Sequence, residues 1–254
     1  MKIITWNVAH QAKTNNTNLF QMAEVLTALS PDIIVLTEYC PGDLHKKFTS
    51  SLRSLGFGVK TSECPPTEKT QNHVLIASRM SMEETDSGVP LDSYHAIPCN
   101  ALQVTIPEHS LGILGLRLPV SMTAAQMKTW WDWVTAVAER NQNHPFIILG
   151  DFNTDLSSEG PNGGRRLIKL KEDGWYHALP KEGASYWSRR GGVISPFRID
   201  HAFCSRNINV LSSEYLTEYG QFLFAKIPDT HSEETKKIKA MSDHAILVVE
   251  FDLK

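Results

Sequence analysis

A short apolar run followed at once by acidic and amide side chains places the tightest constraint on the fold. The run is Ile147-Ile148-Leu149, and Gly150, Asp151, Phe152 and Asn153 follow it. Large and branched apolar residues in so short a run indicate a buried strand, and the glycine lets the backbone turn sharply. Asp151 and Asn153 would then lie at the carboxyl end of the strand, where α/β proteins bind ligands. Both are also ordinary turn residues, so this stretch alone does not separate a site from a turn.

Length and composition favour one globular domain. The chain has 254 residues, 41% hydrophobic and 21% charged, without a repeat, a linker or a break in composition. We therefore expect a single domain over residues 1–254. The net charge is −3, so any nucleic-acid binding would depend on local basic patches. No apolar run approaches the length of a membrane span.

The four cysteines bear on the compartment. Cys40, Cys64, Cys99 and Cys204 form no CxxC pair, which argues against a zinc site. Directly after Met1 comes Lys2-Ile3-Ile4-Thr5-Trp6, which has the pattern of a strand and not of a signal peptide. We therefore predict a cytosolic protein with reduced cysteines.

The spacing of apolar residues predicts strands interspersed with a few helices. The expected helices cover residues 19–29, 42–55, 124–141 and 164–172. Thr17 or Asn18 would cap the first of these helices, and Ser121 or Thr123 the third. The expected strands cover residues 2–8, 33–37, a short stretch from 59, 73–78, 101–106, 111–118, 146–149, 197–203 and 245–251, and residues 205–240 are expected to be irregular. Without strict βα alternation, this order indicates α/β or α+β layers, with two packed sheets and helices outside.

Two segments combine the groups that bind phosphate chains. The helix at 164–172 carries Arg165, Arg166, Lys169 and Lys171, which form either a phosphate-binding patch or a solvated helix face. The segment Tyr186-Trp187-Ser188-Arg189-Arg190 puts aromatic rings beside arginines. Stacking combined with phosphate contact uses such a mixture, although the edge of a sheet does too.

Polar residues stand at the ends of several predicted strands: Asn7, Glu38, Asp151, Asn153, Asp200, Asp243 and His244. Four of them are carboxylates, which would repel one another unless a cation held them together. Oxygen ligands of this kind suit Mg²⁺ or Mn²⁺. The set therefore points to metal-assisted hydrolysis of a phosphate ester. Arg117 interrupts an apolar strand, so we expect it to face a carboxylate or a bound phosphate.

Five motifs carry a family resemblance. They are Thr5-Trp6-Asn7, Leu36-Thr37-Glu38, Gly150-Asp151-Phe152-Asn153, Arg198-Ile199-Asp200-His201 and Ser242-Asp243-His244. With these five motifs in this order, the sequence resembles the endonuclease/exonuclease/phosphatase superfamily. That superfamily includes exonuclease III, DNase I, sphingomyelinases and inositol polyphosphate phosphatases. The resemblance implies a four-layered α-β-β-α sandwich, with two mixed β-sheets flanked by helices and the site at one edge.

The resemblance also assigns roles. Glu38 would be the principal Mg²⁺ ligand, with Asn7 and Asp243 close to the metal, and Mn²⁺ would substitute. Asp151 would orient or deprotonate the attacking water, and Asn153 would hold Asp151 and the phosphate. His244 would contact the scissile phosphate while Asp200 fixes its ring. Water would then attack phosphorus in line.

The chain departs from the family pattern at two positions. Thr37 stands where family members commonly have Gln, and Arg117 stands where many have His or Tyr. We predict that Arg117 acts as a fixed cation on the phosphate. An arginine cannot serve as a general acid, so the leaving group would need another proton source.

The substrate follows from a looser likeness. Gly174-Trp175, the Tyr186–Ser188 segment and Arg198-Ile199-Asp200 resemble exonuclease III-like DNA repair enzymes. This likeness implies binding of DNA, with abasic sites as the expected target, through Trp187, Arg189 and Arg190. We expect the protein to be a monomer. The alternative is a phosphoesterase of a lipid headgroup or a small molecule. A non-catalytic binding module would have lost ligands that are all present here. A basic, open cleft would favour DNA, and a closed pocket or apolar loops would favour the alternative.

Overall fold

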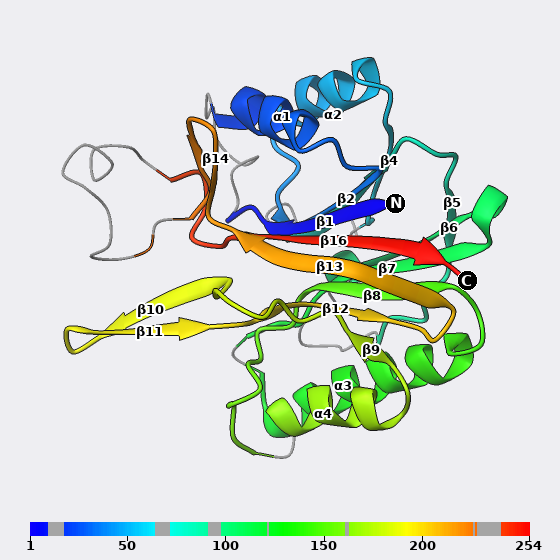
Figure 1. Ribbon diagram of the computed structural model, residues 1–254, viewed down its shortest axis with the longest axis vertical. Coiled ribbons are helices and arrows are strands. Elements are labelled where there is room, and N and C mark those ends of the chain that lie inside the picture. The colour runs from blue at the N-terminus through cyan, green and yellow to red at the C-terminus, as the bar shows by residue number, and fades with distance from the viewer. Residues whose placement is uncertain are drawn as a thin grey trace.

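Two six-stranded sheets lie face to face, with helices on both outer sides (Figure 1). The computed structural model describes residues 1–9, 18–63, 72–90, 98–120, 122–160, 163–225, 227 and 240–254. The first sheet has the order β13 (Ile208–Leu216), β16 (Ile246–Leu253), β1 (Lys2–Asn7), β2 (Ile33–Tyr39), β4 (His73–Ser78) and β3 (Gly58–Thr61). The second has the order β5 (Glu83–Thr85), β6 (Ala101–Ile106), β7 (Leu111–Arg117), β8 (Phe146–Asp151), β12 (Asp200–Cys204) and β9 (Tyr176–His177).

The helices and two small ribbons complete the described elements. Figure 1 shows α1 and α2 over the first sheet and α3 and α4 over the second, so the predicted four-layered sandwich is confirmed. The helices are α1 (Asn18–Ala28), α2 (His45–Ser54), α3 (Ala124–Asn141) and α4 (Gly164–Glu172), with 3-10 turns η2 (Pro98–Asn100) and η3 (Pro107–His109). The ribbons pair β10 (Tyr186–Arg190) with β11 (Val193–Phe197), and β14 (Glu218–Tyr219) with β15 (Phe222–Leu223).

Three apolar layers hold these elements together. Neighbouring residues of a strand point to opposite faces, so Ile4 packs under α1 and α2 while Ile3 packs between the sheets. A third layer lies between the second sheet and α3 and α4. Because the central strands are buried on both faces, their sequences read as continuous apolar runs. Parallel pairs, β1 with β2 and β7 with β8, lie among antiparallel ones, so both sheets are mixed.

Two glycines allow the sheets and strands to approach closely. A Cβ on Gly115 of β7 would lie 2.8 Å from a methyl of Val35 and 2.9 Å from one of Val74, both in the facing sheet. A Cβ on Gly150 would lie 2.0 Å from the carbonyl oxygen of Leu116 on the neighbouring strand, and its φ is +138°. Only glycine fits such a position, which explains why Gly150 precedes Asp151.

The helix α3 has the predicted bounds and a defined start. The Thr123 hydroxyl accepts a hydrogen bond from the Gln126 backbone N–H at 3.3 Å, and the Gln126 side chain accepts one from the Thr123 N–H at 2.9 Å. This capping box selects Thr123 over Ser121, which lies outside the described residues. For α1, Thr17 also lies outside them and Asn18 is the first helical residue. None of the described helices has the length and apolar character needed to cross a membrane.

Three sequence predictions are corrected. Residues 197–203 do not form one strand: β11 ends at Phe197 and β12 begins at Asp200. Residues 208–216, predicted to be irregular, form β13, an edge strand whose polar residues face solvent. The cysteines are not all reduced, because Cys99 is disulfide-bonded. Cys40 and Cys204 are buried thiols outside any disulfide, and Cys64 lies outside the described residues. The cytosolic location stays a prediction, without the support of reduced thiols.

Candidate active site

Strand ends from both sheets meet at one edge of the sandwich and surround a cleft of about 610 Å³. Asn7 and Glu38 come from β1 and β2 in the first sheet. Arg117, Asp151 and Asp200 come from β7, β8 and β12 in the second. The cleft is lined by Glu38, Arg117, Val120, Asn153, Asp155, Ser158, Tyr186, Ser188, Val193, Ser195, Phe197, Ile199, Asp243 and His244. Asn7, Asp151 and Asp200 are buried beside these residues.

Asp151 is fully buried and held by amide groups. Its Oδ1 accepts a hydrogen bond from the Asn153 backbone N–H at 2.8 Å. Its Oδ2 accepts bonds from the side-chain amides of Asn7 at 2.9 Å and Asn153 at 3.1 Å. Burial and the nearby Asp200 raise the pKa of Asp151 to about 7, although His244, Arg117 and the Asn153 N–H favour the charged form. A carboxyl group with this pKa is suited to accept a proton near neutral pH.

His244 is bound to Asp200 through Nδ1, with 2.7 Å to Oδ2. Burial lowers the pKa of His244, but the charge and hydrogen bond of Asp200, together with Asp151 and Asp243, outweigh burial and raise it to about 10. The imidazole is therefore positively charged at neutral pH. The Ser242 hydroxyl donates to the Asn7 carbonyl at 2.6 Å and accepts from the His244 N–H. These bonds fix the histidine to the end of β1.

Arg117 lies between two carboxylates. Its Nε is 2.8 Å from Glu38 Oε1, and a terminal guanidinium nitrogen is 2.7 Å from the same oxygen. The Nε is also 3.8 Å from Asp151 Oδ2. Arg117 thus has a carboxylate partner, one of the two alternatives predicted for it. The ion pair between Arg117 and Glu38 joins the two sheets at the cleft.

The ribbon of β10 and β11 projects from the body of the molecule (Figure 1), and residues of both strands line the cleft. Gly191 and Gly192 form its turn with φ of +56° and +83°, values that two-residue hairpins favour. Because strand residues alternate between faces, the residues that line the cleft share one face: Tyr186, Ser188, Val193, Ser195 and Phe197.

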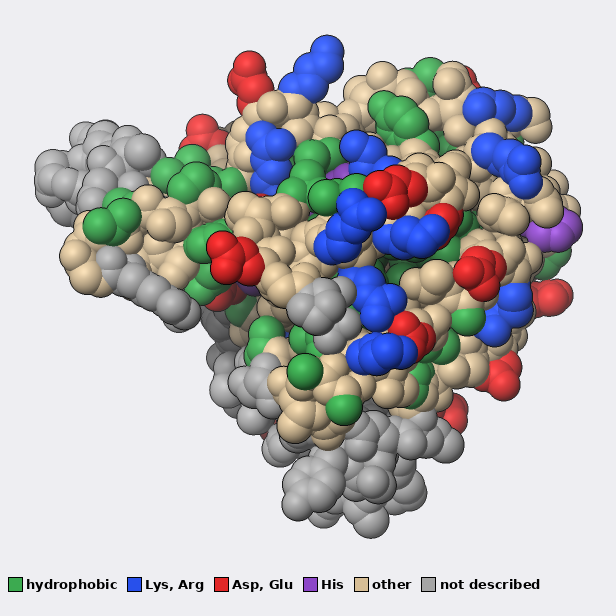
Figure 2. Space-filling model, turned by 90° about the horizontal axis from the view of Figure 1, so that it is seen from below, with side chains coloured by type: hydrophobic (Ala, Val, Ile, Leu, Met, Phe, Trp, Pro, Cys, Tyr) green, Lys and Arg blue, Asp and Glu red, His purple; other side chains and the backbone are tan. Residues whose placement is uncertain are grey.

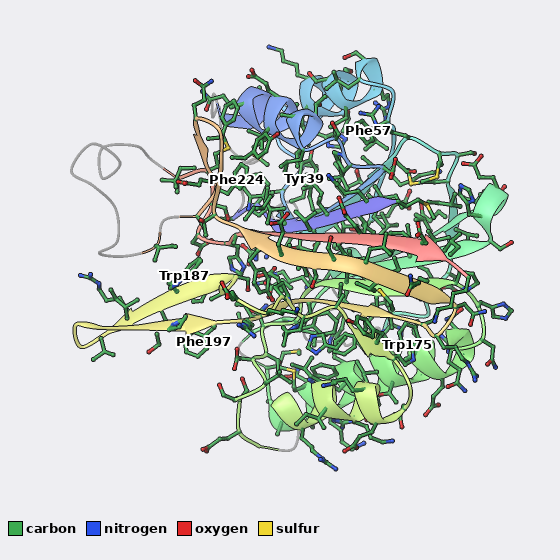
Figure 3. All side chains as sticks on the ribbon, viewed as in Figure 1. Tyr39, Phe57, Trp175, Trp187, Phe197 and Phe224 are labelled. Carbon is green, nitrogen blue, oxygen red and sulfur yellow. The ribbon has the colours of Figure 1, made fainter. Side chains whose placement is uncertain are left out.

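Trp187 and Arg189 belong to the opposite face of this ribbon and are absent from the residues lining the cleft. Figure 3 labels Trp187 and Phe197 on its two strands. The side chain of Arg190 lies outside the described residues. Sequence reasoning placed Tyr186 and Trp187 in one stacking segment but gave the substrate contact to Trp187, and it gave Phe197 no role. A pattern of alternating residues does not say which face meets the site.

A family match accounts for this arrangement. The sequence profile of the Endonuclease/Exonuclease/phosphatase family matches residues 4–244. The chain belongs to this family. Members of the family are phosphodiesterases, nucleases and phosphatases, which are hydrolases acting on ester bonds, and this chain is an enzyme of that class. A search of the curated proteins finds no match.

Solved structures share the fold across the family's range of activities. An AP endonuclease from Archaeoglobus fulgidus aligns with a TM-score of 0.71 and 18% identity over 100% of both chains. A mannosyl-6-phosphatase of Bacteroides thetaiotaomicron VPI-5482 aligns with 0.69 and 16% identity, also over 100% of both chains. D. rerio TDP2, complexed with single strand DNA product, aligns with 0.65 and 13% identity over 99% of this chain and 98% of its own. At these identities the likeness concerns the fold alone.

Enzymes of the family generally depend on a divalent metal, and the donors here fit such an ion. Carboxylates of Glu38 and Asp243 and the amide of Asn153 face one cleft, a set of hard oxygen donors suited to Mg²⁺. Within the described ranges, no three acidic, His or Cys side chains converge to form a cage. Mg²⁺ commonly binds through one or two carboxylates and keeps its waters, so an open site of this kind is compatible with it.

Two residues of the family motifs have left-handed backbones. Glu38 has φ of +50° and Asn153 has φ of +47°. Asn adopts this conformation readily, whereas Glu seldom does. Such strain persists where the surrounding structure imposes it, and it concentrates at functional sites. It turns Glu38 toward Arg117 at the point where the pairing of β2 with β4 is irregular.

The basic helix α4 carries matching acidic partners. Arg165 pairs with Glu172, Arg166 with Asp132 of α3, and Lys169 with Asp173. Figure 2 looks onto this layer and shows blue and red side chains next to each other. These pairs neutralise much of the predicted patch, which favours the solvated helix face.

A buried histidine pair supports the loop after β8. His201 Nε2 is 2.8 Å from the Thr154 carbonyl, and its Nδ1 is 3.0 Å from His177 Nε2. A carbonyl only accepts, so His201 Nε2 carries the proton and His201 Nδ1 accepts from His177. Burial and the neighbouring His201 lower the pKa of His177 to about 2. His201 lies within a predicted motif, but no sequence pattern pointed to His177.

Proposed function

We propose that the chain is a Mg²⁺-dependent phosphodiesterase of the exonuclease III type, which acts as a monomeric single domain on DNA and cuts beside abasic sugars. The observation that carries the reaction is a buried carboxylate of raised pKa directly beside the cleft, together with a cationic histidine that lines the cleft and is hydrogen-bonded to Asp200. These groups are Asp151 and His244. One accepts a proton from water and the other stabilises negative charge on phosphorus oxygens.

Asp151 has the support that a base requires. The amides of Asn7 and Asn153 hold one of its oxygens and the backbone of residue 153 holds the other. This support fixes the direction in which the carboxylate faces a water. Preorganisation of this kind lowers the barrier because no group has to reorient during the reaction. Asn153 also lines the cleft and is available to the phosphate.

The cations of the site act on the phosphate. His244 lines the cleft and keeps its charge through Asp200. Arg117 lines the same cleft and cannot give up its proton, so it stabilises charge without protonating the leaving oxygen. A divalent cation on Glu38, with Asn7 and Asp243 nearby and with Mn²⁺ as a substitute, supplies further positive charge to the phosphate when bound.

The ribbon supports the assignment to DNA. Tyr186 and Phe197 are register partners on its cleft face, and Arg189 lies exposed on the other face. Aromatic faces beside a phosphate site bind a sugar or a base by stacking. The cleft lies at the edge of the sandwich and has a volume of about 610 Å³, so we expect a bound strand to extend beyond it on the surface.

One observation favours a small phosphoester as the second candidate. Three carboxylates line the cleft, those of Glu38, Asp155 and Asp243, against the two cations Arg117 and His244. A polyanionic duplex gains affinity from cations along its path, and carboxylates there oppose it. A small or lipid-derived phosphoester with an apolar group would need only the phosphate site and the wall at Val193 and Phe197.

The experiment that tests the proposal uses a labelled duplex with a single abasic-site analogue, and an undamaged duplex as its control. Both are incubated with Mg²⁺, with EDTA, and with Asp151→Asn protein. A Mg²⁺-dependent nick at the lesion that the variant does not make supports the proposal. Cutting of both duplexes would remove the requirement for damage. If both stay intact while a chromogenic phosphodiester is hydrolysed, the DNA assignment is wrong and the second candidate stands.

A further inference from the structure

Arg117 neutralises the carboxylate that the proposed function gives to the metal. Both of its donors reach one oxygen of Glu38, at 2.8 and 2.7 Å. The side chains of Arg117 and Glu38 are only 12% and 15% exposed, and the Asp151 side chain, 3.8 Å away, is 1% exposed. In this largely dry surrounding, opposite charges attract strongly and an unpaired charge is costly. Removal of either partner would therefore leave a costly unpaired charge.

The backbone holds this pair in place from both sides. Arg117 is the last residue of β7 and the register partner of Asp151 on β8. Glu38 is turned toward it by a left-handed backbone at φ +50°. The guanidinium thus lies between Glu38 of the first sheet and Asp151 of the second, where its positive charge offsets their negative charges.

We infer that Arg117 and the divalent cation compete for Glu38, so that Arg117 is an internal counter-ion displaced when the cation binds. The inference rests on the proposed function, which makes Glu38 the ligand. Mg²⁺ binds oxygen at about 2.0–2.1 Å and requires near-octahedral geometry, whereas the Glu38 oxygen already accepts two N–H donors. A cation bound to Glu38 and the guanidinium of Arg117 would also repel each other, because both are positively charged and both contact the same carboxylate. Binding of one therefore weakens binding of the other.

The displacement gives the freed guanidinium a second role. Arg117 lines the cleft, so release from Glu38 leaves its planar donors facing the space that a phosphate would occupy. Cation binding then prepares the phosphate site, and an empty cation site keeps Arg117 withdrawn on Glu38. A histidine or tyrosine at this position would carry no permanent charge and would not compete in this way.

The test is direct binding of Mn²⁺ to substrate-free protein, with the free ion followed by electron paramagnetic resonance. Arg117→Gln should bind Mn²⁺ at least about tenfold more tightly than the wild type, because one nearby positive charge is removed. Arg117→Lys keeps a charge beside Glu38 and should stay close to the wild type. Arg206→Gln removes the same charge from an exposed site that contacts Gln142, and should also leave affinity unchanged. Melting temperatures establish that each variant is folded.

A double-mutant cycle separates competition from repulsion through space. In a Glu38→Gln background, Arg117→Gln should bring little further gain, because the contested carboxylate is gone. An equal gain in that background overturns the inference, as does unchanged or weaker Mn²⁺ binding by Arg117→Gln itself. Glu38→Gln alone tests the proposed function: if it leaves Mn²⁺ affinity at the wild-type value, Glu38 is not the ligand and both statements are wrong. If it weakens binding while Arg117→Gln changes nothing, only the inference is overturned.

Discussion

Asp151 and Asp200 are direct partners on the neighbouring antiparallel strands β8 and β12, and both are fully buried. Like charges placed opposite each other in a sheet destabilise it. The pair persists because His244 binds Asp200 at 2.7 Å and Arg117 approaches Asp151 at 3.8 Å. The site is therefore a cluster of carboxylates balanced by cations, and its charge state sets both its chemistry and its stability.

Asp151→Asn should separate catalysis from folding. Loss of the base should lower kcat by about 10²–10⁴-fold, the usual contribution of a positioned base. Because burial and Asp200 raise the pKa of Asp151 to about 7, its ionised form is unfavourable in the fold. The free energy of unfolding at pH 8 should therefore be at least that of the wild type. Kinetics and urea titration measure the two effects.

Asp155→Asn is the matched control for this variant. Asp155 lines the cleft beside the buried Asp151, and it accepts hydrogen bonds from the backbone of Arg198 and Ser157. Its replacement should change kcat far less than Asp151→Asn. Equal losses in the two variants would assign the effect to cleft charge and remove Asp151 as the base.

Asp200→Asn should move the pH–rate profile to lower pH. In the wild type, activity should rise as Asp151 ionises near pH 7 and fall as His244 loses its proton near pH 10. Asp200 raises the pKa of both groups, so removal of its charge should shift both limbs toward acid. The alkaline limb should move by about 2 units or more, since the charge and the charged hydrogen bond are lost together. Measurement of kcat/KM from pH 5 to about pH 11 checks this, and an unmoved alkaline limb would exclude His244 as the group titrating there.

Phe197→Ala and Trp187→Ala should have different effects on substrate binding. Phe197 lines the cleft, whereas Trp187 lies on the other face of the ribbon. Loss of Phe197 should raise KM by about tenfold, equivalent to about 1.4 kcal/mol of stacking contact. Trp187→Ala should leave KM nearly unchanged once its melting temperature shows that it is folded. A larger effect at Trp187 would restore the role that the sequence predicted for it.

His177→Gln should flatten the dependence of stability on pH. The pKa of His177 falls from 6.5 to about 2 in the fold, so below pH 6.5 the unfolded chain binds a proton that the folded chain refuses. Stability supplied by neutral His177 is thus lost as the pH falls from 6.5 toward 2. Between pH 6 and pH 5, the wild type should lose about 1 kcal/mol more than the variant. Glutamine keeps a donor for His201, and parallel urea-derived stability curves would contradict the prediction.

Much of the fold was predictable because its signals are local. Strands such as β1 and β4 are buried on both faces, so their apolar runs mark their bounds. The helix α3 combines a periodic apolar face with a capping residue at Thr123. The edge strand β13 was missed because it is mostly solvent-facing and its pairing shifts between Val210 and Ser212. Its polar residues therefore resemble a loop.

The sequence identified the candidate residues of the site but not which of these residues contact one another. Motif order identified Glu38, Asp151, Asp200 and His244, and the structure brings them to one edge. Sequence reasoning left the partner of Arg117 open between a carboxylate and a phosphate. The choice of Glu38 depends on strands of different sheets that lie far apart in the chain. Tertiary geometry likewise decides which face of the β10–β11 ribbon lines the cleft and whether Cys99 forms a disulfide.

The close contact at Gly115 ties the distance between the two sheets to the geometry of the candidate active site. Gly115 and Arg117 lie on the same strand, and Val35, which Gly115 nearly touches, lies on the strand of Glu38. A methyl group at Gly115 would push the two sheets apart three residues or fewer from the ion pair. A substitution there would alter how carboxylates and cations meet without changing any residue of the site. We therefore expect such a substitution to lower the reaction rate, and a second substitution that restores the packing volume to recover it.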